Sequence, residues 1–430
     1  MRFFLRMFLV CLLMLVAQHD GEAANYIEVT AAGNRLLKLA VVPPQPMGPT
    51  IRPELANETA EIHSFDLTMS GLFAAERRDA APLANGLSLT PIDFVPWLSA
   101  GYDLLIRGEY ELRGQELTLE FRLYDVVAKK LLTSKRFLGR EKDLRRYAHS
   151  FSDEVLRALT GEKGSFTSKI LYVSNQSGNK ELFLMDWDGF NPQQLTSNRS
   201  INISPDISPD GREVIFTSYK RGNPDLYKRA LSSNLEVPVS SRSGLNITGA
   251  WSPNGSRIAL SLSKDGNTEI YTVAKDGSSP NRLTVSHAAN VSPSWTPDGS
   301  KIAFVSDRLG KPQIFIMDAS GGNVRRLITG GSYNVNPAWS PKGDKLAFAR
   351  SLGGFQIFVA NADGSGETQL TFEGNNERPR WSPDGRLISF SSRRGGQEAI
   401  YVMRADGSGQ TKVSRTKGNS QHPVWTPRVQ

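Results

Sequence analysis

The side chains that most often carry out chemistry are few in this chain and widely spaced. Beyond the first 23 residues the histidines are His63, His149, His287 and His422, with no i, i+4 pair and no cysteine partner. Structural zinc sites need closely spaced ligands, so this pattern does not indicate one. The segment Asp186-Trp-Asp188-Gly189 resembles the start of a calcium-binding loop, but the remaining ligands are missing and a turn is the better interpretation. We expect no metal site and no cofactor.

A serine nucleophile is also not indicated. Hydrolases of the α/β type hold the nucleophile in a G-x-S-x-G motif, at a sharp turn between a strand and a helix. The motif occurs nowhere in the sequence, and the Gly-Ser-Gly segments at 364–366 and 407–409 belong to repeated turns. We therefore expect no catalytic residue and a protein that is not an enzyme.

A long repeat dominates the elements that must position the functional residues. An aromatic residue or isoleucine, followed by Ser or Thr, Pro, a variable residue and Gly, recurs at Ile207, Trp251, Trp295, Trp339 and Trp381, with a shortened copy at Trp425. Consecutive copies lie 42 or 44 residues apart. Pro and Gly preset the dihedral angles of a hairpin turn, and alternating apolar runs follow each turn. Four short strands per unit at this period predict the blades of a β-propeller.

The two ends of the repeat region complement each other. The block 169–196 has the second, third and fourth strands of a unit, whereas 420–425 is a first strand with nothing after it. Pairing of these ends closes six blades and hides two sheet edges that would otherwise favour aggregation. The tryptophans of the repeat are then expected to pack between blades rather than to bind a ligand. The enzymatic alternative is a propeller-type hydrolase, either a peptidase or a lactonase whose few metal ligands would have no characteristic spacing.

One face of the predicted propeller carries a repeated polar residue. Because successive strands alternate in direction, the fourth-to-first and second-to-third loops emerge on the same side, called here the loop face. Five residues before each repeat motif stand Asn202, Asn246, Asn290, Asn334, Asn376 and Ser420. These asparagines either satisfy backbone groups of the loops or contact a partner directly, and both interpretations stay open. In both cases we expect them to ring the mouth of the central channel.

The formal charges differ between the two sides of the predicted propeller. Loops of the loop face sum to +9, and the hairpin turns of the opposite side sum to −6. This distribution is expected to attract an acidic partner and to speed its encounter, although ordinary solvation of loops explains the same charges. Replacing Arg242 and Arg393 by Glu separates the two explanations. For the whole chain, 51 Lys and Arg against 43 Asp and Glu leave +8, which is too small to indicate a nucleic-acid partner.

The first residues have the pattern of a signal peptide. An apolar run from Met7 to Val16 follows Arg2 and Arg6, and it is too short to span a bilayer. Small residues then allow cleavage after Ala23, which discards the single cysteine of the 430-residue chain. We expect an exported, soluble protein with no disulfide. The stretch Tyr26–Thr30 that follows either adds a strand to the sheet edge of a partner or is the first strand of the next domain.

A small α/β domain is predicted between this segment and the propeller. Strands are expected at 35–42, 104–111, 117–126 and 130–137, and helices within 54–72 and over 141–159, the second ending at Gly161. The predicted organisation is a signal peptide at 1–23, a flexible segment at 24–34, the α/β domain at 35–160, a junction at 161–168 and a six-bladed β-propeller at 169–430, closed by the C-terminal strand.

The end of the second predicted helix carries the most specific motif, Arg146-Tyr-Ala-His149-x-x-x-Asp153-Glu-Val-x-x-x-Leu159-Thr-Gly161-x-x-Gly164. Together with the exported α/β domain and the six repeats, it resembles the TolB family of the periplasmic Tol–Pal envelope system over essentially all of residues 24–430. Departures from the family pattern are minor, such as Ile207 in place of a tryptophan. The resemblance implies no catalysis and a role in outer-membrane integrity during cell division.

The same resemblance implies two protein partners in the periplasm of a Gram-negative bacterium. Binding of the peptidoglycan-associated lipoprotein Pal is expected on the loop face and binding of TolA through the N-terminal segment, with the two events coupled. Other outer-membrane lipoproteins are further candidates, and no nucleic acid or small-molecule substrate is expected. The candidate Pal-binding residues are Asn202, Arg242, Leu245, Asn246, Thr248, Asn290, Val291, Asn334, Val335, Asn376, Glu377 and Arg393. The candidate TolA-binding residues are Asn25, Tyr26, Ile27, Glu28, Val29 and Thr30.

Overall fold

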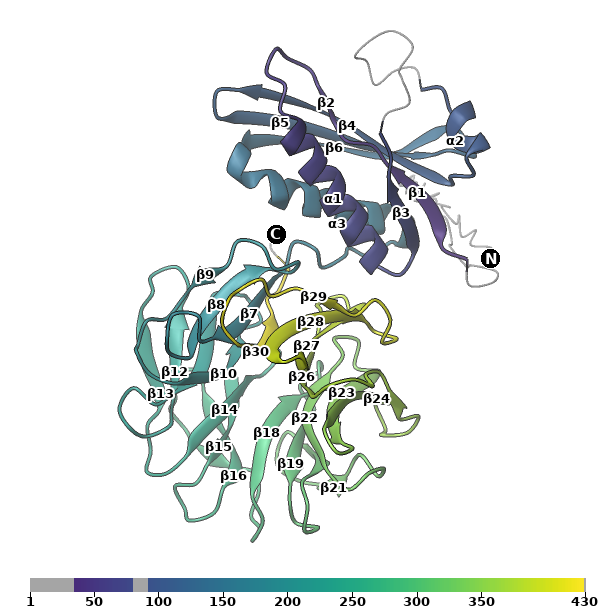
Figure 1. The fold of residues 1–430 in the computed structure, drawn as a ribbon. Helices are drawn as coiled ribbons and strands as arrows, with labels where there is room; N and C mark the ends of the chain where they lie inside the picture. The colour runs from purple at the N-terminus through teal and green to yellow at the C-terminus, as the bar shows by residue number, and fades with distance from the viewer. Residues whose placement is uncertain (1–34, 80–91, 429–430) are drawn as a thin grey trace, which may run out of the picture.

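The computed structural model of the chain describes residues 35–79 and 92–428 (Figure 1). The predicted cleavage after Ala23 and the predicted TolA-binding segment, Asn25 to Thr30, lie outside the described residues. Within the described ranges, no helix combines the length and the apolar character that crossing a membrane requires.

The amino-terminal part is a mixed sheet with two long helices packed against it. Its strands are β1 (Leu37–Val41), β2 (Gln45–Pro46), β3 (Phe73–Arg77), β4 (Leu104–Arg113), β5 (Glu116–Asp125) and β6 (Lys130–Arg140), and its helices are α1 (Pro53–Met69), the short α2 (Val95–Ser99) and α3 (Leu144–Thr160), which follows a 3-10 turn at Glu141–Asp143. The sheet order is β3-β1-β4-β5-β6, and β2 pairs with β4. Strands β3, β1 and β4 run parallel, whereas β4, β5 and β6 are antiparallel. The α/β prediction is confirmed, and β2, β3 and α2 are additions to it.

Local sequence explains where the two long helices begin and end. Helix α1 starts at Pro53, whose fixed dihedral angle suits the first helical position. Helix α3 buries Tyr147, Phe151 and Val155 along one stripe. It ends at Gly161, which takes a left-handed conformation with φ of 76° as a C-terminal cap. Both helices lie between the sheet and the propeller (Figure 1).

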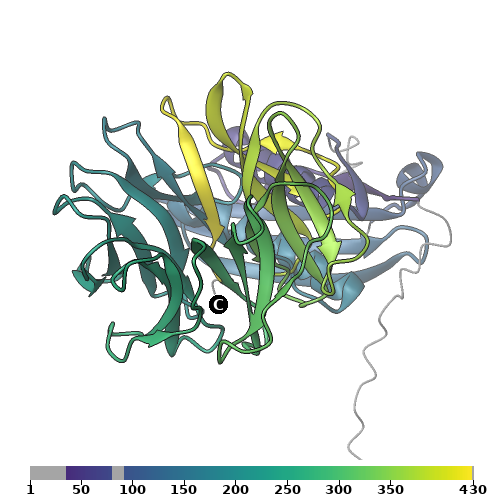
Figure 2. The same ribbon diagram turned by 90° about the horizontal axis from the view of Figure 1, so that it is seen from below.

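From residue 169 on, the described chain forms six four-stranded sheets, the blades, around a common axis (Figure 2). Blade 1 consists of β30 (Ser420–Trp425), β7 (Lys169–Ser174), β8 (Glu181–Asp186) and β9 (Gln193–Gln194). Blade 2 is β10 (Asn202–Ile207), β11 (Glu213–Ser218), β12 (Asp225–Ala230) and β13 (Glu236–Ser240), and blade 3 is β14 (Asn246–Trp251), β15 (Arg257–Leu262), β16 (Glu269–Ala274) and β17 (Asn281–Arg282). Blade 4 is β18 (Asn290–Trp295), β19 (Lys301–Ser306), β20 (Gln313–Asp318) and β21 (Arg325–Arg326). Blade 5 is β22 (Asn334–Trp339), β23 (Lys345–Ser351), β24 (Phe355–Asn361) and β25 (Thr368–Gln369), and blade 6 is β26 (Asn376–Trp381), β27 (Leu387–Gly395), β28 (Gln397–Arg404) and β29 (Thr411–Lys412).

The C-terminal strand closes the ring, as predicted. Strand β30 pairs with β7 in antiparallel register, with Ser420 opposite Ser174 and Trp425 opposite Ile170. Beyond the strand, the Thr426 backbone N–H donates to the Lys169 carbonyl oxygen at 2.8 Å. The blades therefore form a closed circle held by backbone hydrogen bonds between the two ends of the repeat region.

The repeated Pro-x-Gly turns join neighbouring blades. A Cβ atom placed on Gly255 would lie 3.7 Å from Cδ of Pro209 in the preceding blade, and the same contact recurs around the ring. At the closure, Pro427 of the shortened copy takes this place against Gly211. The repeat tryptophans also reach across blades, since Nε1 of Trp295 donates to the Ala250 carbonyl oxygen at 3.2 Å. The predicted packing role of these tryptophans is confirmed.

The α/β domain lies against the hairpin side of blades 1, 5 and 6, so the loop face points away from it (Figure 1). Trp187, in the third-to-fourth turn of blade 1, is fully buried and stacks on Phe65 of α1 with ring centroids 5.0 Å apart. Phe166 of the junction lies 5.3 Å away on the same tryptophan. One apolar cluster thus continues from the helices into blades 1 and 6. The Asp186–Gly189 segment is a turn, as predicted, and its tryptophan forms this contact between domains.

Candidate functional site

A group of charged residues is buried where the two domains meet. Arg145 of α3 forms ion pairs with Asp188 and with Glu58, the second at 2.8 Å. His149 Nδ1 lies 2.9 Å from Asp66 Oδ2, and its Nε2 lies 3.5 Å from Asp188 Oδ2. Burial lowers the pKa of His149, but the charges of Asp66 and Asp188 outweigh that effect and raise it. These pairs join α1, α3 and blade 1, and we assign them to holding the domains together.

Asp153, in the motif that carries the family resemblance, ties the junction to α3. Its carboxylate accepts hydrogen bonds from the backbone N–H groups of Phe166 and Thr167 at 2.9 and 3.1 Å, and from the Thr167 hydroxyl at 2.8 Å. Burial raises the pKa of Asp153, and these donors oppose the rise. The motif residues His149 and Asp153 therefore have structural partners.

The five repeated asparagines begin the first strands of blades 2 to 6, and their side chains are covered. Each has an exposed fraction of 0%. Asn290 shows the pattern: Nδ2 donates to Glu269 Oε2 at 2.7 Å and to the Ala288 carbonyl oxygen at 3.1 Å, and Oδ1 accepts from Arg308 at 3.0 Å. The geometry supports the first interpretation, in which asparagine satisfies loop groups. Direct contact between these side chains and a partner would require the loops to open.

Arginines of the second-to-third loops, or of the end of the strand before them, are held by the same asparagines. Arg308, Arg350 and Arg394 each donate to the asparagine of their own blade, at 3.0, 2.8 and 3.2 Å. Each guanidinium also lies over two aromatic rings, as Arg350 does over Phe348 and Phe358 at 5.3 and 4.4 Å from the centroids. Some of the positively charged groups of the loop face therefore pack on aromatic rings of their own blade.

The other predicted site residues occupy different environments. Leu245 is 37% exposed. Val291 and Val335 are half-buried against apolar clusters, and Glu377 accepts a hydrogen bond from Asn375 at 2.6 Å. The Arg393 guanidinium lies 3.2 Å from Glu398 at the surface.

Arg242 differs from what a steering role requires. Its guanidinium donates to the Ser240 hydroxyl at 2.8 Å and to the Gly277 carbonyl oxygen of the next blade at 3.0 Å. Its replacement by Glu would break a contact between blades, so it is not a clean test of charge steering.

Exposed apolar side chains are distributed over the loops of the loop face, and of these the sequence analysis named only Leu245. Ile201, Leu245, Val285, Leu309, Leu352 and Phe372 have exposed fractions between 37% and 80%. They stand in the fourth-to-first or the second-to-third loops. Exposed apolar groups beside polar residues are typical of protein-binding surfaces. Their signal in the sequence was weak, because single apolar residues in loops are common.

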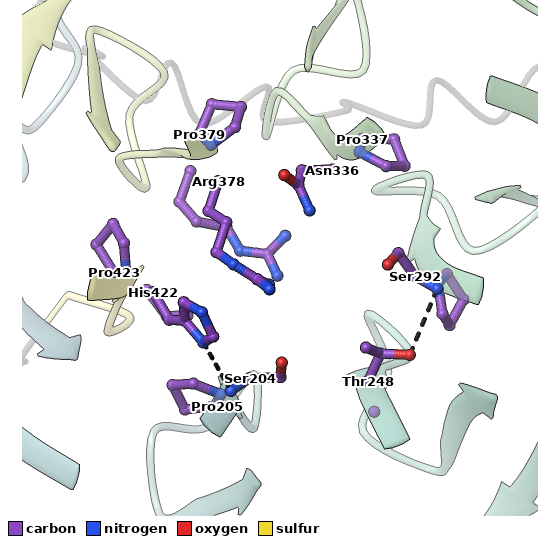
Figure 3. Close-up of a pocket in the computed structure, with 14 residues that line it drawn as sticks. Ser204, Pro205, Thr248, Ser292, Asn336, Pro337, Arg378, Pro379, His422 and Pro423 are labelled. Atoms are coloured by element: carbon purple, nitrogen blue, oxygen red, sulfur yellow. Dashed lines mark hydrogen bonds between the residues drawn. The ribbon is translucent and has the colours of Figure 1, made fainter. Parts of the chain in front are cut away.

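A second feature that the sequence analysis missed is a ring of residues around the central channel, further along the first strands than the asparagines. Two residues after each asparagine position, the first strand carries a non-glycine residue with φ between 51° and 57°: Ser204, Thr248, Ser292, Asn336, Arg378 and His422, called here the channel ring (Figure 3). The register of each first strand shifts at this point, as in a β-bulge. Left-handed conformations are costly for such residues and concentrate at functional sites. Thr248 is the member that was predicted as a site residue.

Comparison with known proteins agrees with the architecture. Residues 25–132 match the family described as the TolB amino-terminal domain, and residues 156–429 match the family described as the TolB beta propeller domain. The chain is 64% identical to the Tol-Pal system protein TolB of Geobacter metallireducens over 427 residues, covering 98% of this chain and 99% of that protein. It is 65% identical to the Tol-Pal system protein TolB of Geobacter sulfurreducens over 403 residues, covering 94% and 93% of the two chains.

A solved structure shows the same arrangement of both domains. The crystal structure of TolB from Acinetobacter baumannii superposes with a TM-score of 0.79 at 27% sequence identity. The match covers 91% of this chain and 97% of the other.

Proposed function

The chain belongs to the TolB family, and we propose that it acts in the periplasm as a non-catalytic adaptor of the Tol–Pal system. In this proposal the loop face binds the lipoprotein Pal, and residues 25–30 bind TolA. Cleavage after Ala23 releases the chain into the periplasm with that segment near its new N-terminus. The two binding events maintain outer-membrane integrity during cell division.

The observation that carries the proposal is the difference between the two sides of the propeller. The hairpin side of blades 1, 5 and 6 contacts the α/β domain, whereas the loop face points away from that domain. The loop face also carries exposed apolar side chains, among them Leu245, Leu309 and Phe372. Apolar anchors surrounded by polar groups favour docking of a protein.

The proposed Pal site uses exposed residues of the loops together with half-buried residues of the first strands, and the buried asparagines support them from below. Leu245, Val291 and Val335 supply apolar contact, and Thr248 lines the channel. Glu377 and Arg393 supply polar contacts near the rim. Asn202, Asn246, Asn290, Asn334 and Asn376 hold the loop conformations that present these residues.

A matched pair of leucine substitutions tests the Pal site. Leu245→Asp places a charge on the loop face, and Leu235→Asp places the same charge on the opposite turn of blade 2, where Leu235 is 62% exposed. We expect L245D to weaken Pal binding about tenfold or more, as at other binding hot spots, and L235D to leave it unchanged. Calorimetry with purified Pal measures both. Equal affinities for the two variants would contradict the proposed site.

Deletion of residues 24–33 tests the TolA segment. We expect TolA binding to be lost and thermal unfolding to be unchanged, because the described α/β sheet begins later, at Leu37. Loss of folding would contradict the view that this segment is a tether. A pull-down from envelope extract that recovers no lipoprotein, together with turnover of peptide or lactone substrates, would favour the hydrolase alternative.

A further inference from the structure

The channel ring surrounds a small cavity on the propeller axis. The cavity has a volume of about 40 Å³. A single water needs about 10–15 Å³ on this measure, so the space suits a group of a few atoms. The ring begins two residues below the asparagine layer, which places it about 7 Å below the mouth at the usual rise of a strand. Only a narrow, protruding group can reach it from the loop face.

The cavity lining is cationic. Arg378 and Arg380 line it, and no aspartate or glutamate does. In the described parts of the chain, neither guanidinium has a hydrogen-bond acceptor or a carboxylate within ion-pair distance. Burial lowers the pKa of Arg378 to about 10, so the group is still charged at neutral pH. Arg378 points into the cavity from the ring (Figure 3).

The acidic groups near these arginines make their hydrogen bonds and ion pairs with other residues. Glu377 accepts from Asn375 at 2.6 Å, and Glu398 lies 3.2 Å from Arg393. Asp206, near Arg380, accepts from the Trp251 backbone N–H at 2.8 Å. Burial raises the pKa of Asp206, and the charge of Arg380 opposes that rise.

His422 adds a neutral donor to the lining. Its Nδ1 accepts a hydrogen bond from the Ser204 backbone N–H at 2.9 Å, so the ring carries its proton on Nε2 (Figure 3). Burial lowers the pKa of His422, and Arg378, Lys180 and Arg380 lower it further, which keeps the ring neutral. The hydroxyl groups of Ser204, Thr248 and Ser292 and the amide of Asn336 complete the polar lining.

We propose that this cavity is a carboxylate receptor, filled by the acidic side chain of the protein that docks on the loop face. Two guanidinium groups present parallel N–H donors that match a carboxylate, and the cavity is too small for an organic cofactor. The source of the carboxylate rests on the proposed function, whereas the receptor itself rests on the cavity. A loop tip with one protruding Asp or Glu fits both the depth and the small volume of the cavity.

The receptor is tested with glutarate as a small carboxylate probe. The chain from residue 24 on is labelled with ¹⁵N-arginine, and its side-chain Nε–H resonances are followed by NMR during a glutarate titration. We expect glutarate to shift resonances that are absent from the Arg378→Gln/Arg380→Gln double variant. Arg221→Gln, which removes one charge from a loop of the same face outside the cavity, is expected to keep the response. No shift in the unmodified chain would overturn the receptor.

The source of the carboxylate is tested with Pal. We expect the double variant to bind Pal at least tenfold more weakly and R221Q to change the affinity less than twofold. Glutarate should also compete with Pal for the unmodified chain. If Pal binds the double variant as it binds the unmodified chain, the side-chain source is overturned and the proposed function survives. If glutarate binds and Pal does not bind at all, the proposed function is overturned and the receptor survives.

Folding of the variants is controlled separately. Thermal unfolding of the double variant should match that of the unmodified chain, because the two guanidinium groups hold no partner within the described residues. The conservative variant Arg378→Lys keeps the charge and loses the paired donors. We expect it to restore only part of the glutarate response, and full restoration would overturn the bidentate geometry.

Discussion

Single residues of the loop face divide into those that hold the loops and those that are exposed to a partner. The asparagines belong to the first group, since they combine complete burial with several hydrogen bonds each. Leu245 and Phe372 belong to the second. Substitutions in the two groups should therefore act on different quantities, stability for the first and affinity for the second.

Asn290 provides the test of the holding role. Asn290→Ala removes donors from the Glu269 carboxylate and the Ala288 carbonyl, and an acceptor from Arg308. We expect a loss of about 2 kcal/mol in the free energy of unfolding, because Glu269 is fully buried and charged groups need their partners. Urea unfolding measures the loss. Asn290→Ser copies the residue at the equivalent position 420 and should cost less. If N290A unfolds with the same free energy as the unmodified chain, the asparagines do not hold the loops, and the interpretation that they contact a partner is favoured.

His63 provides a pH test in the α/β domain. It is almost fully buried between Phe121 and Phe151, and burial lowers its pKa to about 3, with a smaller effect from His149. In the unfolded chain the His63 imidazole binds a proton near pH 6.5, whereas in the folded chain it stays neutral. The contribution of neutral His63 to folding stability is therefore fully present above pH 6.5 and is lost as the pH falls toward 3. Between pH 7 and pH 5, His63 should lower the free energy of unfolding by about 2 kcal/mol.

The measurement compares urea unfolding at the two pH values. The free energy of unfolding of His63→Leu should fall by about 2 kcal/mol less between pH 7 and pH 5 than that of the unmodified chain, whatever the effect of the substitution at pH 7. The exposed His287→Leu serves as the control and should leave the decrease unchanged. An equal decrease for H63L and the unmodified chain would show that His63 does not titrate as the structure requires.

For single residues, the sequence predicted the position in the blade better than the burial and contacts of the side chain. The repeat fixes the place of the five asparagines in the blade, and each begins the first strand of its blade. Their burial depends on loops that fold back over them, which a period cannot predict. The channel ring could not be predicted from the sequence, because its members share a backbone conformation and not a residue type. They include residues as different as Ser204, Arg378 and His422.

Among the elements, the C-terminal strand has the largest effect on the whole ring. Strand β30 supplies the first strand of blade 1, and Pro427 continues the contacts between turns against Gly211. The sequence predicted this closure because one end lacks a first strand and the other end supplies it. The contact between Trp187 and α1 was not predictable in the same way, since its partners are distant in the sequence and belong to no repeat.

Truncation before Ser420 tests the closure. Without the last eleven residues, β7 becomes an open edge and the apolar residues behind it are exposed. We expect the thermal unfolding temperature to fall by about 10 °C or more. A shorter truncation that removes only residues 429 and 430 keeps the strand and Pro427, and should leave the temperature unchanged. Equal heat resistance of both products would contradict closure by the terminal strand.

For the whole molecule, the uneven charge distribution should govern how fast a partner arrives. Lys311 and Lys417 are exposed on the loop face, and in the described residues they have no ion-pair partner. We expect Lys311→Glu/Lys417→Glu to slow association with Pal about 3- to 10-fold at low salt and to leave dissociation unchanged. Surface plasmon resonance at several salt concentrations measures both rates.

The control for this experiment moves the same charge elsewhere. Lys129 and Lys130 are exposed on the α/β domain, and Lys129→Glu/Lys130→Glu makes the same change in net charge without changing the loop face. Its association rate should stay near that of the unmodified chain, and all variants should converge at high salt. Equal slowing by K129E/K130E would assign the effect to net charge instead of to the loop face.

The central claim is that a protein partner docks on the loop face and makes no contact with the hairpin side. Hydrogen–deuterium exchange of the chain with and without Pal tests it most directly. The account predicts slower exchange in the fourth-to-first loops, including 241–246 and 286–290, with no change in the third-to-fourth turns such as 274–280. Protection confined to those turns, or no protection on the loop face at saturating Pal, would contradict it.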